Sequence, residues 1–219
     1  MTGVLALVGG AEFTSSSLDI DRELVERSGG TEVLVVPTAA AFEYPERAIV
    51  TASHQFAQLG ATVRGLMVLR RPDANDPDMA LIAQRSRFIY LAGGSPMHLK
   101  SVLKDTPLWD AIVAAWNDGA VLAGSSAGAM VLSDPMVDPR GGAFTIGLGL
   151  VKPLAVIPHV DEWSHDRFHR TVQLAPKGVP VAAIPSGSAA LRNGDGRWEL
   201  RGDVRILVDG RPAEASVLP

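Results

Sequence analysis

Four short apolar segments, each followed within two residues by glycine or proline, set the strongest limit on how this chain can fold. They span residues 4–8, 33–36, 88–91 and 121–123. The segments are continuous rather than alternating, which is typical of strands buried on both faces of a parallel sheet. Residues 46–59 and 108–116 repeat apolar side chains every three or four positions, as amphipathic helices do. This order predicts an α/β fold with a doubly wound, mostly parallel sheet flanked by helices.

The last forty residues follow a different pattern. Apolar segments at 189–192, 198–200 and 204–208 are separated by turn sequences at 193–196 and 201–203, and Asp209-Gly210 supplies a further turn. Hairpin turns of this kind predict a C-terminal antiparallel β ribbon that closes the sheet. Because no linker intervenes, we expect one domain over residues 1–219, which is within the usual size of domains. The alternative is a separate second domain.

Composition and charge exclude several function classes. The chain has 20 Lys and Arg against 24 Asp and Glu, a mildly acidic balance that argues against nucleic acid as a partner. The absence of cysteine excludes disulfides, thiolate metal sites and a cysteine nucleophile. No segment approaches the ~20 apolar residues that span a bilayer, and the N-terminus lacks the basic region of a signal peptide. We therefore expect a cytoplasmic protein with no membrane partner.

One motif points to nucleophilic catalysis. Gly124-Ser125-Ser126-Ala127-Gly128 directly follows a predicted strand, which is the setting of a G-x-S-x-G nucleophile elbow. Such a tight turn exposes the Ser126 hydroxyl at the carboxyl edge of the sheet, where α/β proteins bind their ligands. It also leaves the Ala127 amide free at a helix N-terminus, where an oxyanion could form. The alternative is a turn of small residues that only packs closely.

A serine nucleophile needs a base, and histidine is the usual one. The chain has five histidines: His54, His98, His159, His165 and His169. His159 follows the apolar residues 154–157 and Pro158, so it is predicted at a strand end beside the crevice. It is our candidate base, with a purely structural histidine as the alternative. His98 could line the same crevice, whereas the other three are predicted on exposed helical surfaces.

Paired glycines follow two of the predicted strands. After residues 88–91, Gly93-Gly94 would let backbone amides approach a ligand closely, and Gly94 could supply a second oxyanion donor. The alternative is an ordinary turn at a strand end. Gly9-Gly10 continues as Ala11-Glu12-Phe13, which does not match the dinucleotide pattern G-x-G-x-x-G. No zinc signature such as H-E-x-x-H is present, so we expect no metal and no cofactor.

Taken together, these motifs resemble the cyanophycinase and dipeptidase E serine peptidases, whose fold is that of class I glutamine amidotransferases. The similar segments span most of the chain in order: residues 7–12, 88–94, 124–129, 147–150, 156–161 and 188–209. The resemblance implies Ser126 as nucleophile, His159 as general base, and the amides of Gly94 and Ala127 as the oxyanion hole. It also implies a small peptide or amide as substrate.

The sequence departs from these relatives at two places. Many of them carry an acidic residue where this chain has Ser186, so the group that orients the histidine is open between Ser186, Asp161 and another residue. After the paired glycines this chain has Ser95-Pro96, where relatives have a polar pair, and Ser95 is a candidate substrate-binding residue together with Arg167 and Arg170. Arg167 and Arg170 lie two residues later than the substrate-facing arginines of relatives. The alternative for both arginines is a solvated helix face.

The predicted function is therefore a serine-type peptidase or amidohydrolase that cleaves small peptides or isopeptides through an acyl-enzyme on Ser126. The alternative is a catalytically silent relative that binds a small molecule or a partner in the same crevice. Glutamine amidotransfer is excluded because it requires a cysteine nucleophile in that fold. The oligomeric state is open, with a homodimer among the possibilities.

Overall fold

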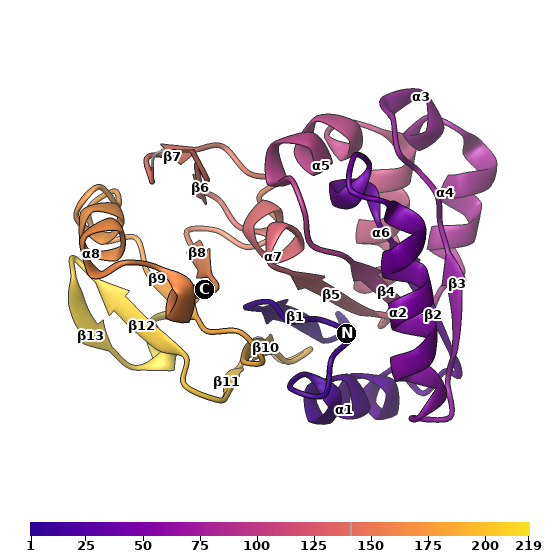
Figure 1. The fold of residues 1–219 in the computed structure, drawn as a ribbon, viewed down its shortest axis with the longest axis horizontal. Coiled ribbons are helices and arrows are strands. Elements are labelled where there is room, and N and C mark those ends of the chain that lie inside the picture. Colours follow the sequence, from indigo (N-terminus) through magenta and orange to yellow (C-terminus); the bar gives the residue numbers. More distant parts are fainter. Residues whose placement is uncertain (141) are drawn as a thin grey trace.

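The computed structural model describes residues 1–140 and 142–219. Its central sheet has seven strands in the order β11-β10-β1-β5-β4-β2-β3, with β1 to β5 parallel and the other two antiparallel (Figure 1). The strands are β1 (Leu5–Val8), β2 (Glu32–Val36), β3 (Thr62–Gly65), β4 (Phe88–Leu91), β5 (Val121–Ser125), β10 (Ala189–Arg192) and β11 (Trp198–Arg201). The predicted α/β class and mostly parallel sheet are confirmed.

Helices cover both faces of this sheet. They are α1 (Leu18–Ser28), α2 (Pro45–Ala57), α3 (Arg71–Ala74), α4 (Pro77–Gln84), α5 (Pro96–Leu103), α6 (Pro107–Asn117) and α7 (Ala127–Leu132). Successive strand residues point to opposite faces, so Ala6 and Val8 pack with α1 and α2, whereas Leu5 and Leu7 pack with α4 to α7. Both faces are buried, which explains why the strand segments are continuously apolar.

Proline and capping residues fix where several helices begin. α2, α4, α5 and α6 each have proline in the first turn, where the missing N–H leaves no helical hydrogen bond unmade. The Thr106 hydroxyl caps α6 by accepting a hydrogen bond from the Trp109 amide. These local signals place the helices close to their predicted boundaries.

The register of the parallel strands brings several loops together at one edge. Val8 pairs with Ser125, and Leu91 pairs with Gly124. The segments that follow β1, β4 and β5 therefore leave the sheet at its carboxyl edge, side by side. These segments contain the turns at Gly9-Gly10 and Gly93-Gly94 and the turn around Ser126, which we call the serine turn.

A second sheet has four strands in the order β13-β12-β9-β8, and lies beside the central sheet in Figure 1. Its strands are β8 (Ala155–Pro158), β9 (Val181–Ile184), β12 (Arg205–Val208) and β13 (Arg211–Ala213). The remaining elements are β6 (Met136–Val137) paired with β7 (Phe144–Thr145), α8 (His165–Gln173) and the short helices η1 (Thr38–Ala40), η2 (Val160–Glu162) and η3 (Ala215–Val217).

The C-terminal ribbon differs from the prediction in one respect. Residues 193–196 and 209–210 form the predicted hairpin turns, but 201–203 connect the two sheets, because β12 pairs with β9 and not with β11. Ile206 of β12 is thereby buried against the apolar residues of the second sheet. Burial of this side chain explains why β12 leaves the ribbon.

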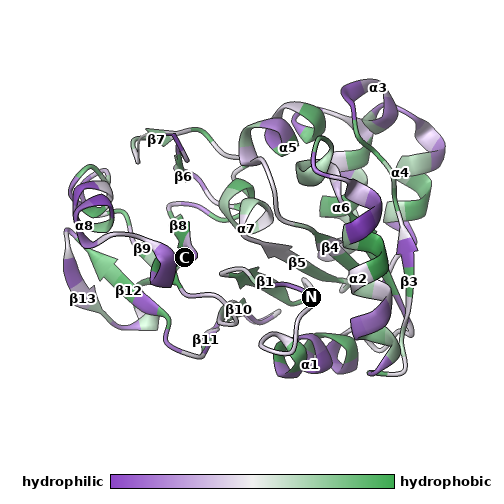
Figure 2. Cartoon of the chain, in the orientation of Figure 1, coloured by the Kyte–Doolittle hydropathy of each residue, from purple (hydrophilic) through white to green (hydrophobic). Residues whose placement is uncertain are grey.

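In Figure 2 strands such as β1 and β12 are mostly hydrophobic, whereas β13 and α8 are largely hydrophilic. One apolar cluster contains residues of the central sheet, such as Leu122, together with residues of the second sheet, such as Val156. The two sheets therefore share buried contacts. Among the described helices, none combines the length and the apolar character that crossing a membrane requires.

Candidate active site

Ser126 occupies the sharp turn between β5 and α7. Its backbone has φ 50° and ψ −108°, a sparsely populated conformation for a residue with a side chain. The flanking glycines allow the turn, because a Cβ at Gly124 would lie 2.5 Å from the Gly128 carbonyl carbon, and one at Gly128 would lie 2.4 Å from the Leu91 oxygen. The side chain of Ser126 is half-buried at the carboxyl edge of the sheet.

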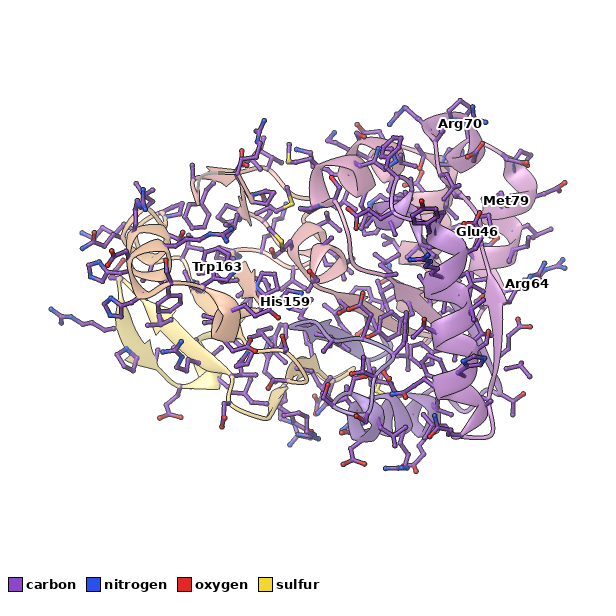
Figure 3. All side chains as sticks on the ribbon, viewed as in Figure 1. Glu46, Arg64, Arg70, Met79, His159 and Trp163 are labelled. Atoms are coloured by element: carbon purple, nitrogen blue, oxygen red, sulfur yellow. The ribbon has the colours of Figure 1, made fainter. Side chains whose placement is uncertain are left out.

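His159 is brought to the same place by the segment that follows β1. The Ser126 N–H donates to the Val8 carbonyl oxygen at 2.9 Å, and the His159 N–H donates to the neighbouring Gly9 oxygen at 2.8 Å. The imidazole lies against Gly10, where a Cβ would be within 2.0 to 2.5 Å of three ring atoms. Figure 3 shows His159 at the junction of the two sheets. Two successive carbonyl groups therefore anchor both candidate catalytic residues.

The described residues contain no hydrogen bond of 3.5 Å or less between the Ser126 hydroxyl and the His159 ring. Such bonds are often long in ligand-free enzymes and shorten when substrate binds. The backbone N–H groups of both residues bond to the successive carbonyl groups of Val8 and Gly9, so the two residues follow neighbouring positions of one segment.

The other imidazole nitrogen is held by a hydroxyl and a carboxylate. His159 Nδ1 lies 3.0 Å from Ser186 Oγ and 3.4 Å from Glu162 Oε1, and Ser186 Oγ donates to Glu162 Oε1 at 3.4 Å. Because a carboxylate can only accept, we assign the Ser186 hydroxyl as donor to Glu162 and as acceptor of the Nδ1 proton. This tautomer leaves a lone pair on Nε2, which is the state a general base requires. Asp161 accepts the Ser186 N–H at 2.8 Å and so positions the serine backbone.

Two backbone amides near the serine are available to an oxyanion. In the part of the chain that the structure describes, neither the Gly94 N–H nor the Ala127 N–H has a hydrogen-bond acceptor. Gly94 is exposed and has φ 134°, and a Cβ there would lie 2.3 Å from the Ala39 oxygen. Only glycine fits this close approach. That these two amides form an oxyanion hole stays a prediction.

The remaining predicted site residues have other roles in the structure. Ser95 caps α5, where its hydroxyl accepts the His98 N–H at 3.3 Å, and its own N–H donates to Ala39. The Arg167 guanidinium stacks on the Trp163 ring at 3.7 Å from its centroid and bonds the Pro139 oxygen. Arg170 is exposed in the last turn of α8. None of the three contacts Ser126 or His159 through a hydrogen bond among the described residues.

Sequence reasoning left Glu12 without a role. Its Oε1 accepts the Gly93 N–H and its Oε2 accepts the Ser125 hydroxyl, both at 2.8 Å. Only the position of Glu12 after the first Gly-Gly pair pointed to it. The spacing of two or three residues predicts that Asp161 and Glu162 point away from His159, whereas Glu162 Oε1 lies 3.4 Å from its Nδ1. The described residues include no group of three or more His, Asp or Glu side chains suited to a metal ion.

Below the serine turn lies a buried polar cluster. Asp21 is fully buried, and this burial raises the pKa of its carboxyl to about 6, although the hydrogen bonds from Gln55 and Ser17 lower it. Burial likewise raises the pKa of the Tyr90 phenol well above its usual value, and Glu12 and Asp21 add to that rise. The carboxyl of Asp21 therefore keeps its proton to a higher pH than an ordinary aspartate does.

Comparison with known proteins identifies the family. The model of peptidase family S51 matches residues 5–199, which is most of the chain. The chain belongs to this family of serine peptidases. It is similar to a cyanophycinase from Synechococcus elongatus, 27% identical over 215 residues that cover 95% of this chain and 66% of the relative. A cyanophycinase from Trichormus variabilis is 30% identical over 193 residues, covering 84% of this chain and 62% of the relative.

The chain thus spans slightly less than two thirds of the length of these curated relatives. A solved structure of similar size also matches, a peptidase from an acI-B1 actinobacterium. It superposes with a TM-score of 0.87 at 31% identity, covering 97% of this chain and 93% of that one. The predicted membership of the cyanophycinase and dipeptidase E family is confirmed.

Proposed function

We propose that this protein hydrolyses peptide or isopeptide bonds in small substrates through an acyl-enzyme on Ser126. The observation that carries the proposal is the common anchor of Ser126 and His159 on the Val8 and Gly9 carbonyl groups. This anchor supports a pairing of the half-buried serine with a histidine whose Nε2 acts as the base. Both features are requirements of nucleophilic catalysis by serine.

In the proposed mechanism, Nε2 of His159 takes the Ser126 hydroxyl proton as Oγ attacks the substrate carbonyl carbon. The negative charge that develops on the carbonyl oxygen is bound by the N–H groups of Gly94 and Ala127. The imidazolium then gives its proton to the leaving amine, and the C–N bond breaks. Water, deprotonated by the same Nε2, hydrolyses the ester and regenerates Ser126.

The acidic member of this triad is assigned to Glu162, acting through Ser186. Glu162 Oε1 lies 3.4 Å from both the imidazole Nδ1 and the Ser186 hydroxyl, so its negative charge faces the imidazolium. The side chain is 67% exposed, and solvent weakens its attraction. We therefore expect Glu162→Gln to lower kcat by about 3–10-fold, less than the ~10⁴-fold loss known for a buried triad aspartate.

A fluorophosphonate probe tests the proposal, because it reacts with activated serines. Labelling of the purified protein should occur at Ser126, disappear in Ser126→Ala and fall strongly in His159→Ala. Ser133→Ala is a matched control, since Ser133 lies at the other end of α7, where its hydroxyl donates to the Met130 carbonyl oxygen, and its loss should leave labelling unchanged. Labelling that persists in Ser126→Ala would refute the assignment.

Substrate class is then measured with a library of dipeptides and β-linked isopeptides. Release of a free amine, at a rate that Ser126→Ala abolishes, is the expected result. The silent-relative alternative draws on Ser186, a hydroxyl where relatives carry an acid. If the natural protein cleaves nothing and Ser186→Glu creates cleavage, that alternative is correct.

A further inference from the structure

We infer that Glu12 is a positioning residue that ties the Gly93-Gly94 turn to the serine turn and so fixes the geometry of the oxyanion hole. The inference rests on the proposed function for its catalytic consequence, and on the hydrogen bonds of Glu12 for its structural part. Glu12 follows β1 and lies between two segments that are 32 residues apart in the sequence, the turn at Gly93 and the end of β5 at Ser125.

Each carboxylate oxygen of Glu12 binds one of these two segments. Oε1 accepts the Gly93 N–H at 2.8 Å, and Oε2 accepts the fully buried Ser125 hydroxyl at 2.8 Å. An ionised carboxylate accepts hydrogen bonds at both oxygens without donating any, and such charged bonds are stronger than neutral ones. Its two acceptors therefore suit two donors that belong to different segments.

The absence of a side chain at Gly93 leaves room for this carboxylate. A Cβ at Gly93 would lie 2.5 Å from Glu12 Oε1 and 3.4 Å from the Cβ of Ser126. The carboxylate thus fills the space that a side chain at Gly93 would occupy, immediately beside the nucleophile. Residue 93 is therefore glycine because a side chain there would collide with the Glu12 carboxylate and contact the serine turn.

The hydrogen bond of Glu12 to the Gly93 N–H also determines which amide remains available to an oxyanion. The Gly93 N–H is taken by Glu12, and the Ser95 N–H is taken by the Ala39 oxygen at 2.8 Å. Gly94 lies between these two fixed points, and its own N–H has no acceptor among the described residues. The bonds at Gly93 and Ser95 fix the turn on both sides of Gly94 and leave the Gly94 N–H unbonded. An oxyanion hole needs donors that are held in place in this way before the substrate binds.

Three variants test this role: Glu12→Ala, Glu12→Gln and Gly93→Ala. Glu26→Ala is the matched control, because Glu26 is exposed on α1 and the same side chain is removed. Two quantities are measured, namely the rate of hydrogen exchange at the Gly93 amide and the rate of fluorophosphonate labelling at Ser126. Thermal unfolding of each variant shows that it is folded before rates are compared.

In Glu12→Ala, the Gly93 amide should exchange about 10–100-fold faster, the factor expected for losing a hydrogen bond to a charged group. Labelling should slow by about 10–100-fold, somewhat less than for deleting an oxyanion donor outright. Glu12→Gln keeps Oε1 for the Gly93 N–H, and its amide can donate to Ser125 Oγ, so it should stay within about fivefold of wild type with an unchanged pH profile. Gly93→Ala, which expels the carboxylate, should resemble Glu12→Ala.

An equal exchange rate of the Gly93 amide in wild type and Glu12→Ala would show that Glu12 does not hold the Gly93-Gly94 turn. Labelling as slow in Glu12→Gln as in Glu12→Ala, with a shifted pH profile, would also overturn the positioning role, since the charge itself would then matter. If the wild-type protein is not labelled at all, the proposed function fails, whereas exchange at Gly93 still decides whether Glu12 holds the turn.

Discussion

The buried carboxyl of Asp21 makes a testable link between pH and stability. Asp21 has no exposed surface, and its pKa is raised from the ordinary 3.8 to about 6, mainly by burial. The folded state therefore binds the Asp21 proton more tightly than the unfolded chain does. Between pH ~4 and ~6 the native protein holds the extra proton, so the contribution of Asp21 to the free energy of unfolding falls as pH rises.

The difference between 3.8 and about 6 corresponds to about 3 kcal/mol, which is the stability lost across this pH window. Asp21→Asn removes the titration but keeps an oxygen that can accept the hydrogen bonds of Ser17 and Gln55. Near pH 4, where Asp21 is protonated in the folded state and about half protonated in the unfolded chain, the variant and wild type should differ by well under about 1 kcal/mol. At pH 7 the variant should be more stable by up to about 3 kcal/mol.

Urea unfolding of both proteins from pH 4 to pH 8, followed by circular dichroism, measures this difference. Asp19→Asn is the control, because the side chain of Asp19 is 93% exposed on the same helix and should give no such trend. The reasoning is refuted if the stability difference between Asp21→Asn and wild type is constant over the whole range. A constant difference would mean that Asp21 titrates alike in the folded and unfolded chains.

Three further substitutions have expected outcomes. Phe56→Ala removes a fully buried ring that contacts three other aromatic rings, and should lower the free energy of unfolding by ~3–5 kcal/mol in urea titrations. Hydrogen bonds from Asn193 and then Arg201 lower the pKa of Glu199 to about 2, so this network stabilises the fold above pH ~4.5 and is lost as pH falls towards 2. Arg201→Ala should therefore cost about 1 kcal/mol at neutral pH, and less in high salt, because the pair is partly exposed. Gly128→Ala places a Cβ 2.4 Å from a backbone oxygen, and should lower the Tm and abolish Ser126 labelling together.

The central sheet could be predicted from the sequence because its signals are local. Continuous apolar segments such as residues 88–91 indicate burial on both faces, and glycine or proline marks each strand end. Strand pairing is a different matter, since the chain near Gly202 shows only a turn. Whether β12 then pairs with β11 or β9 depends on where Ile206 is buried, and that contact joins residues distant in sequence. Hairpin signals predict a turn but not the partner of the next strand.

In the candidate site, too, residues in a local motif could be predicted and residues that act through distant contacts could not. Ser126 and its glycines form a continuous motif whose strand-turn-helix setting is visible in the sequence. Glu12, by contrast, acts on residues 81 and 113 positions away, so no local pattern assigns it a role. It could be found only once the parallel register had placed the ends of β1, β4 and β5 at one edge.

The orienting group of His159 shows why a replaced residue does not by itself mean a lost function. Sequence comparison alone reads Ser186 as a missing acid. In the structure, however, the two acidic residues after His159 both bind Ser186, Asp161 at its N–H and Glu162 at its hydroxyl. The hydroxyl can accept from Nδ1 and donate to Glu162 at once, which a carboxylate in its place could not do. A carboxylate on one loop and a hydroxyl on the other can therefore fix the imidazole tautomer, the property on which the basicity of Nε2 depends.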